Sequence, residues 1–119
     1  MIARYTRPEM ARIWSEEARL GRWLDVELAL VDELAARGEV PADAARTLRR
    51  DARVNVTRMQ EIEAEVHHDV IAFVSSVAET LGDESRFLHL GLTSSDVVDT
   101  AFAMQLRDAA DLLLARKFA

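Results

Sequence analysis

The chain has 119 residues, enough for one modest domain, and its 50% hydrophobic content is enough to supply a core. Its 15 Lys and Arg stand against 21 Asp and Glu, and this net charge of −6 argues against binding a nucleic-acid polymer through its phosphates. The chain has no Cys, which excludes disulfides, thiol nucleophiles and thiolate metal sites.

The composition favours long helices joined by short turns, because Ala, Leu, Glu and Arg are abundant and there are only four Gly and two Pro. We therefore expect an all-α fold of about six helices. No apolar run approaches the length of a membrane span, and the first residues lack the apolar core of a signal peptide. These absences predict a soluble, cytoplasmic protein that makes no contact with a membrane.

A short helix is predicted near the N-terminus, since Thr6 and Glu9 have the spacing of a capping box and Pro8 suits a first helical turn. Arg4 and Tyr5 should then lie in an extended segment that leads into this helix. From the sequence alone, the simplest interpretation of this pair is an ordinary mobile terminus with a solvated Arg.

Three further helices are predicted between residues 15 and 66. Ser15 should open a helix that ends at Gly38, and Trp23 on its mainly apolar stripe is expected in the core. A shorter helix should follow Pro41 and carry a solvated arginine face, and Asn55 can cap the next helix. The stripe consists of Leu20, Trp23, Leu24, Glu27, Leu28, Val31, Leu34 and Ala35, and the arginines are Arg46, Arg49, Arg50 and Arg53.

The helical pattern breaks at His67, His68 and Asp69, before a fifth stripe that ends ahead of Gly82. Asp69 would make a good N-cap for the fifth helix and leave both histidines in the break, where side chains can be aimed. Two other interpretations are open: a capping Asp beside two surface histidines, or a metal site that also uses His89. We expect no metal, because adjacent histidines usually point apart and no His-x-x-x-His pair stacks on a helix face.

The chain is organised around a glycine-containing turn, residues 89–93, that leads into a long helical pattern. Thr93 or Ser94 should be the N-cap, since Thr93 and Asp96 have approximately the spacing of a capping box. A helix start offers unpaired N–H groups and a partial positive charge, which together with the hydroxyls could hold an anion. The plainer alternative is that these residues only cap the helix.

Three motifs resemble the N-terminal part of the adenylosuccinate lyase family, within the fumarase/aspartase superfamily. They are Arg4-Tyr5, His68-Asp69-Val70 and the run that begins His89-Leu-Gly-Leu-Thr-Ser-Ser-Asp. They stand in the family's order and at its separations, and the similarity covers essentially the whole chain. One departure is His67, where the family is expected to have Arg or Asn.

The resemblance implies a lyase of purine biosynthesis that eliminates fumarate from adenylosuccinate, giving AMP, and from succinyl-aminoimidazole carboxamide ribotide. It implies that Arg4 and Tyr5 contact the nucleotide end of this small-molecule substrate, and that no metal or organic cofactor takes part. His68, held by Asp69, would hydrogen-bond the substrate or donate a proton, and His67 and Asp69 are implied in substrate binding with it. Further residues implied in substrate binding are His89, beside the pocket, and Thr93 and Ser94, on the succinyl carboxylate.

The resemblance also implies that residues 1–119 form a single helical domain of a longer lyase, cut within the helix that begins near residue 93. The superfamily's long helical bundle would start there. The general base, a Ser on a flexible loop, and a second His would lie beyond residue 119, so the fragment alone should be inactive. Family members are homotetramers whose sites combine residues from three subunits.

The alternative is a helical interaction or oligomerisation module without catalysis. It would gain support if the three motifs lay more than about 20 Å apart, with none lining a shared pocket.

Overall fold

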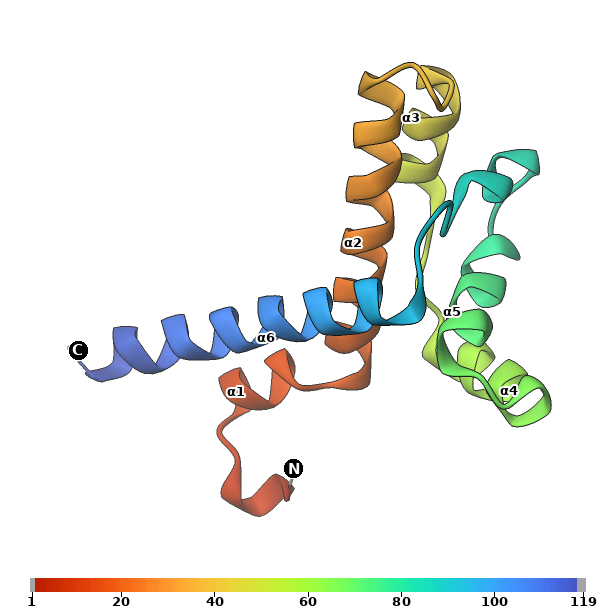
Figure 1. Ribbon diagram of the computed structural model, residues 1–119. Helices are drawn as coiled ribbons and strands as arrows, with labels where there is room; N and C mark the ends of the chain where they lie inside the picture. The colour runs from red at the N-terminus through yellow and green to blue at the C-terminus, as the bar shows by residue number, and fades with distance from the viewer. Residues whose placement is uncertain (1, 118–119) are drawn as a thin grey trace.

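The computed structural model describes residues 2–117, which contain helices and turns but no strand (Figure 1). This confirms the predicted all-α fold of about six helices, and the two longest helices begin where predicted. In chain order the elements are η1 (Ala3–Tyr5), α1 (Pro8–Ile13), α2 (Glu16–Ala36), α3 (Ala42–Asp51), α4 (Val56–Val66), α5 (Asp69–Ala78), η2 (Asp83–Phe87) and α6 (Ser94–Lys117).

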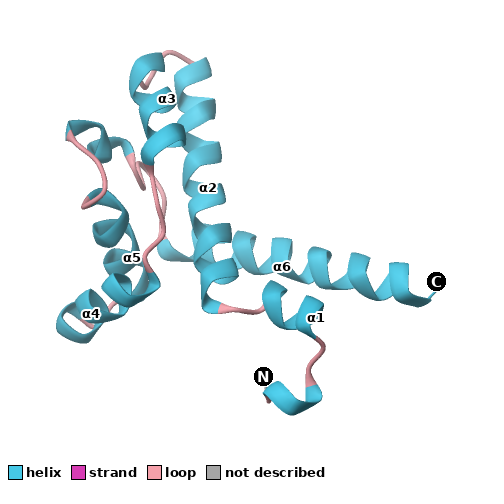
Figure 2. Cartoon of the chain, turned by 180° about the vertical axis from the view of Figure 1, so that it is seen from behind, coloured by secondary structure: helices cyan, strands magenta, loops and turns pink. Residues whose placement is uncertain are grey.

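Helix α2 is the centre of the fold, since α1, α3, α4 and α6 all contact it. In Figure 1, α3 lies beside its upper half, while α6 crosses its lower half and then projects away. Helices α4 and α5 pack closely on each other on the opposite side of α2 from the free end of α6. Figure 2 shows from behind that α1 follows the projecting part of α6.

Helix boundaries in the first half of the chain follow the predicted caps. The Ser15 hydroxyl accepts the N–H of Ala18 at 3.1 Å, and the Asn55 side chain accepts the N–H of Arg58 at 3.0 Å. Beyond α2, Gly38 has φ +78, a conformation that L side chains rarely adopt. These signals are local in sequence, so they specify the helix ends without knowledge of the tertiary fold.

The N-terminal segment differs from its prediction. Arg4 and Tyr5 lie in η1, a short 3-10 turn, and not in an extended segment. Thr6 does not cap α1, because its hydroxyl donates to the carbonyl of Ile2 at 2.8 Å and Arg7 occupies the N-cap position. The reason is that proline takes the first helical position, which places the N-cap on the residue directly before it.

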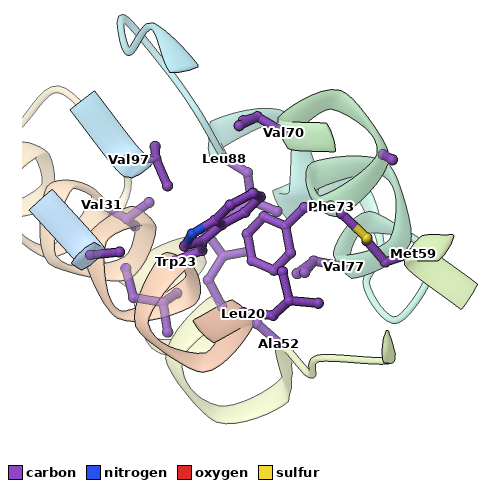
Figure 3. Close-up of a cluster of buried hydrophobic side chains, with 14 of the residues drawn as sticks. Leu20, Trp23, Val31, Ala52, Met59, Val70, Phe73, Val77, Leu88 and Val97 are labelled. Carbon is purple, nitrogen blue, oxygen red and sulfur yellow. The ribbon is translucent and has the colours of Figure 1, made fainter. Parts of the chain in front are cut away.

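The core lies where α2 meets α5, and Figure 3 shows its side chains closing around Trp23 and Phe73. Trp23 is 1% exposed, as predicted, and its ring meets Phe73 edge-on with 5.5 Å between centroids. Met59 of α4, Leu88 of the turn after η2 and Val97 of α6 also belong to this cluster. Burying one such side chain contributes about 1.5–3 kcal/mol, so the cluster holds four helices and a turn together.

The arginines predicted on the α3 face are exposed. Arg46, Arg49 and Arg50 each pair with an aspartate, and the Arg53 side chain donates to the carbonyl of Ala52 at 2.8 Å. Exposed pairs of this kind each contribute about 0–1 kcal/mol, so this face adds little to the stability of the fold.

One surface ion pair ties α4 to the end of α5 and gives a testable pH dependence. Arg58 donates through Nε and Nη2 to the Glu79 carboxylate at 2.8 Å each, which lowers the pKa of Glu79 below its ordinary value of 4.5. As pH falls, the unfolded chain therefore takes up this proton before the folded chain does. The stabilisation is fully present above pH 4.5 and is lost as pH falls through the lowered pKa of the folded state.

We expect Glu79→Gln to lower the melting temperature at pH 7, and the difference from wild type to shrink as the buffer is taken from pH 5 to about pH 3. Thermal unfolding followed by circular dichroism measures this difference. Glu65→Gln, an exposed position on α4, serves as the matched control. A pH-independent effect of Glu79→Gln would contradict the assignment to charge.

The apolar positions of α6 are buried only in part. Val97, Ala101 and Ala109 are buried against the rest of the chain, but Phe102 is 50% exposed and Leu113 is 62% exposed. Phe102 directly follows the buried Ala101, so its exposure reflects the face of the helix on which it lies, whereas Leu113 lies toward the end of α6 that projects from α2. Within residues 2–117, no helix is both long enough and apolar enough to cross a membrane.

Candidate active site

A pocket of about 380 Å³ lies between α5 and the start of α6. Its apolar lining comes from Val70, Ile71 and Val74 of α5 and from Leu92. Four of the eight predicted site residues border it together. Its polar lining consists of His68, Ser75, His89, Thr93 and Ser94.

His68 is fixed at the break between α4 and α5. The prediction that Asp69 caps α5 is wrong: His68 is the N-cap, and its Nδ1 accepts the N–H of Ile71 at 3.2 Å. The cap falls one residue early because His67 adopts a left-handed conformation, φ 55, so that α5 already begins at Asp69. The Asp69 carboxylate instead accepts the N–H of Val70 at 2.7 Å.

The expected contact that holds His68 is also different. Its Nδ1 lies 3.9 Å from the Asp69 carboxylate, beyond hydrogen-bonding distance, so the backbone of α5 and not Asp69 orients the ring. Because Nδ1 accepts a hydrogen bond, the proton of the neutral ring lies on Nε2. His68 can therefore offer an N–H donor to a ligand. His67 is exposed and lies outside the lining of this pocket.

His89 reaches the pocket from the turn before α6, and a buried carboxylate holds it there. Glu27 of α2 is 1% exposed, and it accepts the His89 backbone N–H at 2.8 Å while its other oxygen lies 2.6 Å from His89 Nδ1. His89 has φ 58, a backbone conformation that costs a non-glycine residue about 1–3 kcal/mol. The two bonds to Glu27 offset that strain.

The start of α6 forms the third side of the pocket. The helix begins at Ser94, directly after Thr93, which confirms the predicted helix start. The Asp96 side chain accepts the Thr93 N–H at 2.9 Å, which is one half of a capping box. The Asp96 carboxylate thus uses the Thr93 N–H, one of the donors expected to bind an anion, and it adds negative charge to the first turn of α6. An anion in the pocket would therefore depend more on the hydroxyls of Thr93 and Ser94 for hydrogen bonds.

Arg4 and Tyr5 are not brought to this pocket. Their turn, η1, lies near the N-terminus beyond α1, away from α5 in both views (Figures 1 and 2). The Arg4 guanidinium stacks over the Tyr5 ring at 4.8 Å, and Tyr5 borders a second pocket of about 550 Å³. That pocket lies between the N-terminal segment and the end of α6, where it is also lined by Arg7 and Arg116.

Within the part of the chain that the structure describes, no three His, Cys, Asp or Glu side chains come together in a way that could hold a metal ion. The alternative metal site at the histidines therefore has no geometric support.

Residues 3–117 match the family model described as "Lyase". The chain belongs to the lyase family. Over 96% of its length, this lyase-family chain is 51% identical to the adenylosuccinate lyase of Synechocystis sp. and 45% identical to that of Bacillus subtilis. The predicted resemblance is thereby confirmed. The chain spans 26% of the length of each of these relatives.

A solved structure supports the same family at the level of fold. The crystal structure of a fumarate lyase from Mesorhizobium sp. BNC1 superposes with a TM-score of 0.81 at 27% identity. The match covers 94% of this lyase-family chain and 27% of the solved chain.

Sequence reasoning missed two polar residues of this lyase-family chain. Ser75 lines the pocket from α5, but a serine within an apolar helical stripe gives no signal of its own. Glu27 did give a signal, because it is a single carboxylate in the middle of the apolar stripe of α2. Burying a charge costs free energy unless the charge is paired, so a partner for Glu27 was to be expected. The sequence pattern did not identify His89 as that partner.

Proposed function

We propose that this chain is the N-terminal part of an adenylosuccinate lyase, which eliminates fumarate from adenylosuccinate to give AMP. In purine biosynthesis the same enzyme would act on succinyl-aminoimidazole carboxamide ribotide. One observation carries the proposal: His68 meets Thr93 and Ser94 at one pocket, where α5 and α6 both begin. The identity to adenylosuccinate lyases over nearly the whole chain supports the choice of substrate.

The reaction explains why such a pocket is useful. A base removes the proton from the carbon next to a carboxylate of the succinyl group, and that carboxylate takes on additional negative charge. The C–N bond then breaks, its electron pair passes to the nitrogen, and an acid protonates the nitrogen, which yields fumarate and AMP. Hydrogen-bond donors placed where the charge grows lower the barrier, because they are worth more in the transition state than in the ground state.

The described residues supply binding groups for this reaction. In our proposal the hydroxyls of Thr93 and Ser94 bind the succinyl carboxylate at the positive end of α6, and the Nε2–H of His68 donates to the substrate. The general base and the second His belong to a later part of the full-length protein. Arg4 and Tyr5 lie away from this pocket, so they would reach the nucleotide end of a substrate only in an assembled homotetramer.

The same proposal treats residues 1–119 as one helical domain that is cut within α6. It places the full-length enzyme in the cytoplasm as a homotetramer. The exposed apolar side chains on the projecting half of α6 would be covered in that assembly.

A direct test is fumarate release from adenylosuccinate, followed as an absorbance change, with the full-length protein that carries this segment. We expect release by the full-length protein and none by residues 1–119 alone, because elimination needs a base and an acid in one closed pocket. A full-length protein that releases no fumarate from either succinyl nucleotide would contradict the proposal and favour the interaction module. Release of fumarate by the 119-residue chain would contradict our assignment of the general base and the second His to a later part of the full-length protein.

A further inference from the structure

Glu27 is a buried carboxylate that contacts a residue of the candidate active site. Among the described residues, the buried polar side chains are Glu27, Ser76 and Gln105. Ser76 donates to the carbonyl of Phe73 within α5, and Gln105 donates to the carbonyl of Ile13, which joins α6 to α1; neither side chain lines the candidate active site. Glu27 instead reaches 62 residues along the chain to His89, whose side chain borders the candidate active site.

The hydrogen bonds fix where the His89 proton lies. Glu27 Oε2 accepts the His89 backbone N–H at 2.8 Å, so this side chain acts as an acceptor. Its Oε1 lies 2.6 Å from Nδ1, a distance that requires a proton between the two atoms. Glu27 already accepts through Oε2, and a carboxylate that accepts through both oxygens places the shared proton on Nδ1. The neutral His89 ring then has a free lone pair on Nε2.

His68 has the opposite arrangement. Its Nδ1 accepts the N–H of Ile71, so its proton lies on Nε2. The two imidazoles border one pocket, and their Nε2 atoms have opposite polarity, a donor on His68 and an acceptor on His89.

We propose that Glu27 is a positioning residue that holds His89 in the Nδ1–H form, so that Nε2 of His89 serves the pocket as a hydrogen-bond acceptor opposite the His68 donor. This arrangement suits a ligand that presents both an acceptor and a hydroxyl or N–H donor. The expected effect on catalysis rests on the proposed function, whereas the tautomer does not.

Glu27→Gln separates this role from simple anchoring of the turn. The Gln amide oxygen can still accept the His89 backbone N–H, so the turn is retained. The amide NH₂ now faces Nδ1 and can only donate, which requires an unprotonated Nδ1 and moves the ring proton to Nε2. The substitution therefore reverses the tautomer with little change in shape.

The first experiment is nitrogen-15 NMR of the histidine rings in the 119-residue chain at about pH 8.5, where an ordinary imidazole is neutral. The signals are assigned with His67→Gln and His89→Gln variants. We expect His89 to carry its proton on Nδ1 and His68 on Nε2. In Glu27→Gln the His89 pattern should reverse, while His68 serves as the internal control. A wild-type His89 with its proton on Nε2 would overturn the proposal, even if the variant does not fold.

The second experiment measures fumarate release by full-length wild type, Glu27→Gln and Glu17→Gln. Glu17 is an exposed position on the same helix and serves as the matched control. We expect Glu27→Gln to lower kcat/KM by at least about 10-fold, mainly through kcat, with a melting temperature close to that of wild type. Unchanged kinetics beside a reversed tautomer would overturn the positioning role. An inactive wild type would count against the proposed function and leave the NMR result standing.

Discussion

Trp23→Ala should lower the free energy of unfolding by about 3–5 kcal/mol, the typical cost of removing a fully buried aromatic side chain. Trp23 is 1% exposed and packs edge-on against Phe73, so its loss leaves a cavity between α2 and α5. The Arg19 guanidinium lies over the Trp23 ring, 4.7 Å from its centroid, and cannot fill that cavity without burying its charge. Because small domains are stable by only about 5–15 kcal/mol, this loss is a large share of the total and should clearly lower the urea midpoint.

Urea unfolding followed by circular dichroism measures this change, and Trp14→Ala is the matched control. Trp14 is half-buried and its ring contacts Phe102, which is itself half exposed. We expect a loss of about 1 kcal/mol there, since less apolar area is removed from water on folding. Equal losses in the two variants would show that the α2–α5 contact is not the main source of stability.

Ser94→Ala should lower kcat/KM for adenylosuccinate by about 10²-fold in the full-length enzyme. The reason is that a donor to the carboxylate on which charge develops contributes about 2–4 kcal/mol to transition-state stabilisation. Ser94 is the first residue of α6 and lines the pocket with Thr93 and His68. The proposed hydrogen bond to the carboxylate would be strongest while the carboxylate carries its additional negative charge. Most of the effect should therefore fall on kcat.

Ser95→Ala gives a close control for this prediction. Ser95 is also in the first turn of α6 but is exposed and lies outside the pocket lining. Both substitutions change the helix start in a similar way, so a difference in kinetics reports on the pocket alone. Equal kinetics for the two variants would reduce Ser94 to a helix-start residue without a role in binding.

Sequence reasoning succeeded for features that are determined locally. Ser15 and Asn55 cap their helices, and α6 begins at Ser94, because in each case a side chain accepts a backbone N–H three residues away. It failed where a neighbouring backbone decided the outcome. The left-handed conformation of His67 moved the cap of α5 from Asp69 to its neighbour, and no residue pattern specifies that conformation for a histidine.

The candidate site was predicted as a set of residues but not as an arrangement. The turn between α5 and α6 contains η2, which is too short to show a helical period, so the path of the chain to His89 could not be traced. The separation of Arg4 and Tyr5 from the histidines depends on α1 following α6, a contact between distant parts of the chain. The bond between Glu27 and His89 is likewise a product of the tertiary fold.

Trp23 and Glu27 are one helical turn apart, on the same buried face of α2. The side chain that anchors the core and the side chain that anchors His89 are thus carried by one rigid body. A rotation or axial shift of α2 that accommodated a different core would also displace the imidazole at the pocket. A substitution in the core that moves α2 is therefore expected to move His89 as well, so the packing of the core and the geometry of the pocket are linked through this helix.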